Sequence, residues 1–454
     1  MLKQKWKVCV LTAALAVALC AATALAADLG ENVQAETVTG QEQDSIQTNK
    51  VDQPQEEADS QTESEGDQTQ SEDASMSEEA SEPEELVPDP VGTVSFANLD
   101  SRLRENNLNL LALEENIAAL EVIDYDRMKE DLRTSLNETA DLLWNLTLMG
   151  QSDSYAAGSL QQAYNSMRTT FDDLKDGELQ EDNEAVIRQL RNAQDQVVMT
   201  AQSMYVALVE MELNNSTLDR TLASLDRTVE EMELRYELGQ ISALNLEQTQ
   251  AGKATAVSGQ QTLEMNIANY KTQLELMIGA QLSGTIQLQP LPQVTEKDLE
   301  SMDLEADLEQ AKANSYQLFA AQRTLEDAKE SAREAAKGYT DTTYQYKAAQ
   351  HQRQAAEYTY NATIQSFEMS FRVLYNQVKD DWQVLAAAQT ALACQQDTYA
   401  SMQLKYEQGN LSENKLLDAA DEVSAAQDTV NSAKIDLFSA YNNYRWAVDY
   451  GILN

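Results

Sequence analysis

The chain has 454 residues with a formal net charge of −44, one histidine and three cysteines. Because phosphate-binding surfaces need clusters of basic residues, this charge argues against nucleic acid and anionic lipid as partners. So few His and Cys side chains leave little material for a metal site or a nucleophile. We therefore expect a protein that is not an enzyme, with no catalytic residue, no cofactor and no bound metal.

The first 26 residues have the features of an export signal. Three lysines precede an uncharged run that reaches Ala27, and the small residues Ala24 and Ala26 lie where a signal peptidase would cut. We predict a signal peptide over residues 1–26, with a retained membrane anchor as the alternative, since about 20 uncharged residues can span a bilayer. The sequence thus predicts an exported protein of the cell envelope or cell surface.

Residues 27–94 are acidic and contain very few large apolar side chains. Residues 28–90 hold 20 acidic residues and a single lysine, Lys50. Such a segment cannot bury enough surface to offset the entropy lost on ordering, so we predict a disordered acidic linker. It could act as a solvating spacer, or as a stalk that crosses a polymer layer such as peptidoglycan.

All six prolines lie in the acidic segment or in the short stretch at Pro290 and Pro292. Proline breaks helix interiors, so the long proline-free blocks on either side of this stretch are expected to be helical. We predict a first helical-hairpin repeat over 95–289, a linker over 290–300 and a second helical-hairpin repeat over 301–454. No segment after the signal is apolar and long enough to cross a membrane as a helix.

Two stretches of the chain repeat each other at an offset of 170 residues. Met232–Leu246 has the sequence MELRYELGQISALNL, and Met402–Leu416 has the sequence MQLKYEQGNLSENKL. Both contain the spacing Tyr-x-x-Gly-x-x-Ser. The chain is therefore a duplication.

Each copy is expected to be a pair of long helices joined at its glycine. Apolar residues recur at steps of three, four or seven, which predicts coiled-coil packing. Glycine ends a helix in the left-handed conformation without Cβ strain, and the serine that follows can cap the next helix. From Glu184 to Tyr236 the helix would be about 80 Å long. The predicted fold class is all-α, with long antiparallel coiled-coil helical hairpins in two tandem repeats.

The two turns resemble the hairpin tips of the TolC-like outer-membrane efflux protein family. The resemblance covers roughly residues 95–454 and implies a TolC-like α-barrel protomer, three of which form a hollow barrel. It also implies that one end of the barrel meets a periplasmic-type adaptor and an inner-membrane pump. By this resemblance the hairpin-tip, adaptor-facing residues are Tyr236, Gly239, Ser242, Tyr406, Gly409 and Ser412.

The chain departs from the family pattern in two ways. Three positions after the tip serine the family usually has an acidic residue, and here these positions are Asn245 and Lys415. Each family repeat also carries two membrane β-strands, whereas the corresponding stretches, 147–176 and 338–358, lack an alternating apolar pattern. We expect the membrane strands to be missing, so the sequence does not support insertion into an outer membrane.

For the single histidine, the cysteine of the helical region and the aromatic run near the C-terminus, we expect structural rather than functional roles. His351 lies between two glutamines, and we expect it to be solvated. Cys394 lies in a helical stretch, and we expect an inert buried thiol. The aromatic run that ends the chain, Tyr441 to Tyr450, is expected to serve core or subunit packing rather than ligand stacking.

The predicted function is that of an exported TolC-like conduit component of an efflux or export assembly. It would work without catalysis, as a homotrimer, with an adaptor and a pump as partners. The alternative is a cell-surface structural or adhesive coiled-coil spacer, in which the hairpin seams form a rod. A helical enzyme is the least favoured class.

Overall fold

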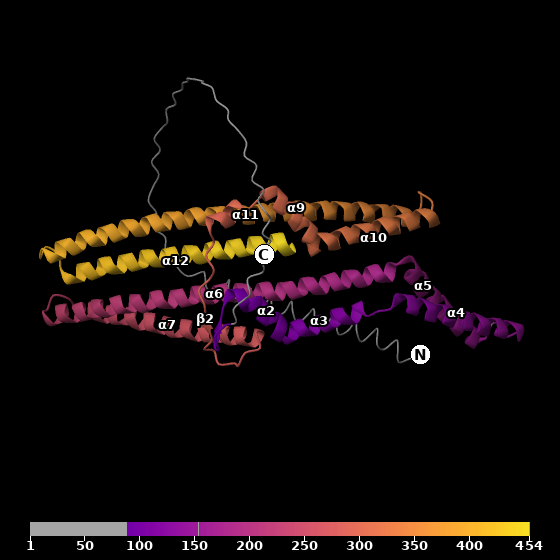
Figure 1. Cartoon of the computed structure of the whole chain (residues 1–454), viewed down its shortest axis with the longest axis horizontal. Helices are drawn as coiled ribbons and strands as arrows, with labels where there is room; N and C mark the ends of the chain where they lie inside the picture. Colours follow the sequence, from indigo (N-terminus) through magenta and orange to yellow (C-terminus); the bar gives the residue numbers. More distant parts are fainter. Residues whose placement is uncertain (1–88, 153, 454) are drawn as a thin grey trace, which may run out of the picture. The chain divides into compact units, whose positions relative to one another are not determined.

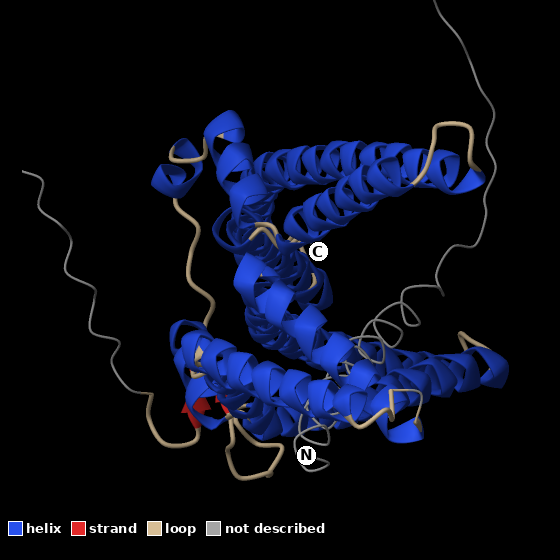
Figure 2. Cartoon of the chain, turned by 90° about the vertical axis from the view of Figure 1, so that its right-hand side faces the viewer, coloured by secondary structure: helices blue, strands red, loops and turns tan. Residues whose placement is uncertain are grey.

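The computed structural model describes residues 89–152 and 154–453. The predicted signal peptide and residues 27–88 of the predicted linker lie outside the described residues. The described part consists almost entirely of helices, with two short strands (Figure 1). A view along the long helices shows these strands beside one group of helices (Figure 2). The all-α prediction is confirmed.

The elements follow the predicted duplication. The first half contains β1 (Thr93–Val94), α2 (Phe96–Asn106), α3 (Leu108–Glu121), α4 (Tyr125–Leu148), α5 (Tyr155–Asp176), α6 (Glu178–Glu237), α7 (Ala243–Met277) and β2 (Gln287–Leu288). The second half contains α8 (Glu296–Glu300), α9 (Leu304–Asn314), α10 (Tyr316–Gly338), α11 (Tyr344–Glu407) and α12 (Glu413–Tyr450). The short helix α8 lies within the stretch for which the sequence predicts a linker.

Two long helical hairpins dominate the structure. Helix α6 has 60 residues and packs along α7, and α11 has 64 residues and packs along α12 (Figure 1). In the second hairpin, large apolar side chains such as Phe371, Val378, Leu437 and Tyr444 form one buried cluster. Each such side chain contributes roughly 1.5–3 kcal/mol when fully buried, so this seam stabilises the pair. The prediction of two tandem hairpins is confirmed.

The two hairpins are joined along α6 and α12. Val206 of α6 lies in a buried cluster with Ile435 and Phe438 of α12. The indole of Trp446 donates a hydrogen bond to Oε1 of Gln202 at 2.7 Å. Both ends of this hydrogen bond are buried, so it fixes the register in which α12 lies on α6.

Strands β1 and β2 pair in parallel and close the base of the first hairpin. Thr93 is opposite Gln287, and Val94 is opposite Leu288. The buried hydroxyl of Tyr205, in the middle of α6, lies 3.0 Å from the carbonyl oxygen of Val94 and 2.6 Å from that of Gln289. The Tyr205 hydroxyl donates its one proton to both carbonyl oxygens, one at the end of β1 and one just after β2. The tyrosine therefore anchors both strands to α6.

The last residues of the predicted linker are built into the fold. The Asp89 carboxylate accepts hydrogen bonds from the Ser95 amide at 3.0 Å and from Nδ2 of Asn98 at 2.8 Å. Burial raises the pKa of Asp89, but these hydrogen bonds and the charge of Arg102 lower it more, so the pKa lies below its ordinary value. Residues 89–94 of the predicted linker therefore belong to the folded elements, because the Asp89 carboxylate holds them to α2.

A similar helix junction occurs once in each half. Helices α2 and α3 meet at Asn107, which donates from Nδ2 to the carbonyl oxygen of Met277 at 2.9 Å. Helices α9 and α10 meet at Ser315, and the neighbouring Asn314 donates to the carbonyl oxygen of Val448 at 3.0 Å. In both halves an asparagine therefore caps the end of the returning helix, where free carbonyl groups need donors.

The stretches that correspond to the family's membrane strands are mostly helical. Residues 147–176 contain the end of α4 and the whole of α5, and residues 338–358 contain a short loop and the start of α11. Among the described residues, no helix combines the length and the apolar character needed to cross a membrane. Helices α4 and α5 instead pack on each other as an extra hairpin of the first half.

Candidate functional site

The first turn has the geometry that its glycine predicts. Gly239 has φ of +68°, and its amide donates to the carbonyl oxygen of Tyr236 at 2.9 Å. The Gln240 amide donates to the carbonyl oxygen of Arg235 at 2.8 Å, which completes a Schellman motif. Ser242 then caps α7 by accepting from the Asn245 amide at 3.3 Å.

The second turn repeats this geometry with a weaker cap. Gly409 has φ of +74°, and its amide donates to the carbonyl oxygen of Tyr406 at 2.8 Å. The Asn410 amide donates to the carbonyl oxygen of Lys405 at 2.9 Å. Ser412 occupies the N-cap position of α12, but its side chain accepts no capping hydrogen bond.

The two turns lie side by side at the same end of the hairpins (Figure 1). Nδ2 of Asn414, just after the second turn, donates to Oε2 of Glu231, just before the first, at 3.3 Å. Farther from the turns, Arg227 of α6 forms an ion pair with Asp421 of α12. The structure thus brings the six predicted tip residues together at one end of the two hairpins.

This end exposes apolar side chains at equivalent positions of the two copies. Leu234 and Leu404 are exposed, and so are Tyr236 and Tyr406. Leu238 and Leu244 add to the exposed apolar surface of the first turn. Large exposed apolar groups that recur in both copies are typical of an interaction surface rather than of a solvated end.

An open hollow of about 380 Å³ lies between α6 and α12, on the side of the hairpin joint near the turns. Its walls carry four carboxylates and one arginine, and they are formed by Thr217, Arg220, Thr221, Ser224, Asp418, Asp421, Glu422, Ser424, Ala425 and Asp428. Arg220 forms an ion pair with Asp428, which also accepts from the Thr217 hydroxyl at 2.8 Å. These polar contacts hold the two hairpins together below the turns.

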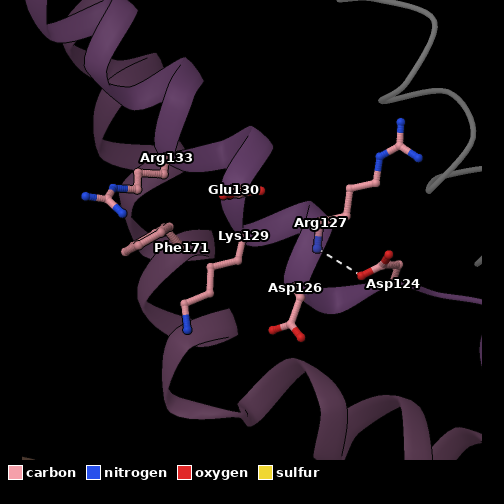
Figure 3. A pocket seen from close by; sticks show the side chains of 7 residues that line it. All are labelled: Asp124, Asp126, Arg127, Lys129, Glu130, Arg133 and Phe171. Atoms are coloured by element: carbon pink, nitrogen blue, oxygen red, sulfur yellow. Dashed lines mark hydrogen bonds between the residues drawn. The ribbon is translucent and has the colours of Figure 1, made fainter.

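A second hollow lies between α4 and α5 (Figure 3). Lys129 and Arg133 of α4 and Phe171 of α5 line it, together with the carboxylates of Asp126 and Glu130. Positive and negative groups alternate there, and one aromatic ring supplies the apolar lining. Ligand pockets are mostly apolar with a few convergent polar groups, so this hollow has the character of a charged helix surface.

The described residues contain no group of three or more His, Cys, Asp or Glu side chains arranged to hold a metal ion. His351 is exposed on α11, as expected. The prediction of a buried thiol is wrong, because Cys394 is exposed on α11. In the aromatic run, Tyr444 and Trp446 are buried in protein contacts, as expected for packing.

One buried acidic group was missed by sequence reasoning. Glu275 at the end of α7 is almost fully buried, and its carboxylate accepts from the amides of Gly284 at 2.8 Å and of Thr285 and Ile286 at 3.1 Å. The Ser283 hydroxyl donates to it at 2.8 Å. Burial raises the pKa of Glu275, but these hydrogen bonds lower it further, below its ordinary value. The carboxylate organises the loop that leads into β2.

The match to known proteins is confined to structure. No family model matches the sequence. No curated protein matches it either.

Three solved structures are similar to the chain. CusC, whose structures concern transmembrane channel formation, gives a TM-score of 0.45 at 14% identity and covers 79% of this chain and 95% of its own. The MtrE outer membrane channel of Neisseria gonorrhoeae gives 0.40 at 13%, covering 79% and 89%. The outer membrane protein VceC of Vibrio cholerae gives 0.40 at 15%, covering 59% and 76%. All three TM-scores are below 0.5, so these similarities carry no conclusion about function.

Proposed function

We propose that this chain is a conduit component of an efflux or export assembly in the cell envelope, and that it acts without catalysis. A single observation carries the proposal. Two equivalent helical hairpins are held together along α6 and α12, so that both turns lie at one end and expose matching leucine and tyrosine side chains. Such an end is suited to receive a partner with helices of its own.

In this proposal the adaptor-facing residues are Tyr236, Gly239 and Ser242 of the first turn and Tyr406, Gly409 and Ser412 of the second. Glycine and serine shape the turns, and the tyrosines supply contact area. Aromatic side chains dominate the energetics of protein interfaces, because they bury much apolar area and lose little conformational entropy. The partners would be a periplasmic-type adaptor and an inner-membrane pump, and the chain would form a homotrimer.

The length of the helices suits a wall rather than an enzyme. A 60-residue helix spans about 90 Å, far more than a compact domain needs. Transport through such a wall would be controlled by its width and its charge. The predicted domain order, with a signal peptide over 1–26 and an acidic linker before the hairpins, would carry the wall out of the cytoplasm on a tether.

Electron microscopy of the purified full chain tests the proposal directly. A conduit gives particles with a central hole in end view. A solid rod without a hole would instead support the alternative of a surface spacer, and the conduit would be rejected.

The tip assignment has a separate test. The double variant Tyr236→Ala, Tyr406→Ala should reduce export, or binding of an adaptor encoded beside this chain, at least tenfold, and circular dichroism should show unchanged helix content. The matched control is Tyr155→Ala, which removes an exposed tyrosine at the start of α5, away from the turns. Equal losses in both variants would refute the assignment.

A further inference from the structure

The last two turns of α4 differ from the rest of the helix in the side chains that they carry. From Asp126 to Asp141 charged residues recur throughout, as is typical of a helix on a protein surface. From residue 142 to 149 the sequence is LLWNLTLM, in which Asn145 and Thr147 are the polar residues. Because each residue turns the helix by about 100°, the six apolar side chains of this stretch point to all sides of α4.

Most of these apolar side chains are exposed. Trp144 is 64% exposed and Met149 is 74% exposed. A helix that is apolar on all sides is normally buried, either in a protein core or in a membrane. We call the exposed apolar residues of these turns the α4 end patch, and they are Leu142, Trp144, Leu148 and Met149.

The loop after α4 closes its own backbone hydrogen bonds. Gly150 has φ of +67°, and its amide donates to the carbonyl oxygen of Thr147 at 3.0 Å. The Gln151 amide donates to the carbonyl oxygen of Leu146 at 2.9 Å, and the Thr147 hydroxyl donates to that of Leu143 at 2.9 Å. Polar groups that are already paired lower the cost of taking this end out of water.

The surroundings of the α4 end patch carry almost no charge. Between Asp141 and Arg168 the sequence has one charged residue, Asp153, although the whole chain has a formal net charge of −44. A partner recognised by ion pairs would need charged groups at this place. The patch therefore offers one driving force for binding, which is the removal of apolar surface from water.

The patch lies at the end of the hairpins opposite the glycine turns. The α4–α5 hairpin precedes the first residue of α6, whereas Gly239 follows the last, and α4 projects beyond the start of α6 (Figure 1). The loop between α10 and α11 lies at the same end, since Arg323 of α10 forms an ion pair with Asp182 near the start of α6. This loop exposes Tyr339 and Tyr344.

We propose that this end of the protein attaches to the surface of a lipid bilayer, with the α4 end patch inserted among the lipids and with Tyr339 and Tyr344 at the level of the headgroups. Tryptophan and tyrosine are enriched at membrane–water interfaces, because their rings are apolar while their N–H and O–H groups reach water. A fluid bilayer accepts a protruding apolar end without a preformed groove. The proposal goes beyond the conduit function and does not rest on it, because a surface spacer could attach in the same way.

The length of the apolar stretch limits the depth of insertion. Eight residues of helix span about 12 Å, whereas the hydrocarbon core of a bilayer is about 30 Å thick. Glu138 and Asp141, on the turn before the patch, are exposed and charged. These carboxylates favour water, so α4 enters the outer part of one leaflet and the protein lies on the membrane without crossing it there.

Charge decides which lipids suit this end. Residues 134–167 contain no lysine or arginine, and Glu138 and Asp141 lie next to the patch. Anionic headgroups would be repelled, because polybasic segments are what attract a protein to them. We therefore expect binding to phosphatidylcholine vesicles that weakens when half of the lipid is replaced by phosphatidylglycerol. Stronger binding to the anionic vesicles would contradict this attachment.

A dye placed in the patch tests the attachment. Met149→Cys, in a full chain with Cys9, Cys20 and Cys394 changed to Ser, carries one NBD group, whose emission rises and shifts to the blue in apolar surroundings. Phosphatidylcholine vesicles should raise this emission about threefold, as expected for insertion below the headgroups. This readout reports on the α4 end itself, so binding of the vesicles through residues 1–26 alone would leave it unchanged.

The matched control carries the same dye elsewhere. The native Cys394 is exposed on α11, and in a chain with Cys9 and Cys20 changed to Ser it takes the single NBD group. Its emission should not change when vesicles are added. The proposal is overturned if the dye at position 149 does not respond, or if the dyes at both positions respond alike, since the chain would then adsorb without a preferred end.

Two further variants test the side chains themselves. The double variant Trp144→Ser, Leu148→Glu, followed by the dye at position 149, should weaken vesicle binding about tenfold or more, because burial of a carboxylate opposes insertion. Val384→Glu, at an exposed apolar position of α11, should leave binding unchanged. Circular dichroism should show the same helix content in both. Equal binding by the double variant and the unsubstituted chain would reject the patch as the attachment site.

Discussion

In the first repeat the middle of the long helix is anchored to strands, whereas in the second it packs only on helices. Tyr205 of α6 reaches the backbone of β1 and of the segment after β2. Its equivalent Tyr375 of α11 packs on Tyr444 in a tilted arrangement with ring centroids 6.0 Å apart, and Tyr444 in turn donates to the Asp307 carboxylate. The duplication therefore kept the turns and the helix junctions, while the middle of each hairpin acquired its own contacts.

The comparison of the two repeats shows at which positions of a helical hairpin the residue type is restricted. The turn depends on backbone geometry within a few residues, and the far end depends on a glycine that lies against the α2–α3 or the α9–α10 junction. The turn requires glycine for its left-handed backbone, and the far end requires it also because another segment packs closely against it. The middle of the hairpin needs only buried apolar area, which many side chains can supply.

The largest effect is expected at the far end of the second repeat. A Cβ at Gly451 would overlap backbone atoms of Ser315, and the residue has φ of +65°. Gly451→Ala should lower the free energy of unfolding by about 3 kcal/mol, since overpacking and left-handed strain add. At Gly279 the nearest atom to the added Cβ is Cβ of Asn106 at 2.8 Å, which is farther away than the Ser315 backbone atoms are at Gly451, so Gly279→Ala should cost less, about 2 kcal/mol. Urea denaturation of both variants measures the difference, and equal costs would show that the closeness of the obstacle does not set the cost.

Tyr205 and Tyr375, in the middle of the two long helices, should also differ in how much they contribute to the free energy of unfolding. Tyr205→Phe removes the donor of the Gln289 carbonyl group, while the Val94 carbonyl group keeps the Gln289 amide as its donor, and the variant should cost about 2 kcal/mol. Tyr375→Phe keeps the ring contact with Tyr444 and should cost less than about 0.5 kcal/mol. Thermal denaturation of the two variants compares them, and a larger loss from Tyr375→Phe would reverse the assignment of the anchors.

Glu275 should give the first repeat a pH dependence that the equivalent Arg445 cannot give the second. Its pKa is lower in the folded than in the unfolded chain, so its contribution is fully present above the unfolded pKa of about 4.3 and is lost as the pH falls through the folded pKa. Glu275→Gln should therefore cost about 1–2 kcal/mol at pH 7, where the carboxylate accepts charge-assisted hydrogen bonds. The gap between wild type and variant should shrink below about pH 4.3. A gap that stays constant from pH 7 to 3 would show that the charge of Glu275 does not matter.

The smallest effects are expected at the turns. A Cβ at Gly239 or Gly409 meets no other atom within 4 Å, so only the left-handed backbone opposes it. Gly239→Ala and Gly409→Ala should each cost about 1 kcal/mol in urea denaturation. A loss as large as that of Gly451→Ala would mean that the turns make contacts absent from this structure.

Sequence reasoning located the hairpins and their turns because both are specified locally. Heptad spacing and the absence of proline predicted the long helices, and Tyr-x-x-Gly-x-x-Ser predicted each turn to the residue. The burial of Cys394 was predicted wrongly. A residue on a helix is buried only if a neighbouring element covers its face, and the periodicity of one helix does not show which faces are covered.

The sequence by itself determined that this protein is a duplicated pair of long helical hairpins, because helix propensity, glycine turns and apolar spacing act over a few residues. Only the tertiary structure decided that Asp89 and Glu275 would be buried acceptors, that Tyr205 would anchor two strands, and that α12 would cover α6 while the matching face of α11 stays open. Each of these depends on contacts between residues far apart in the chain, which no local pattern encodes.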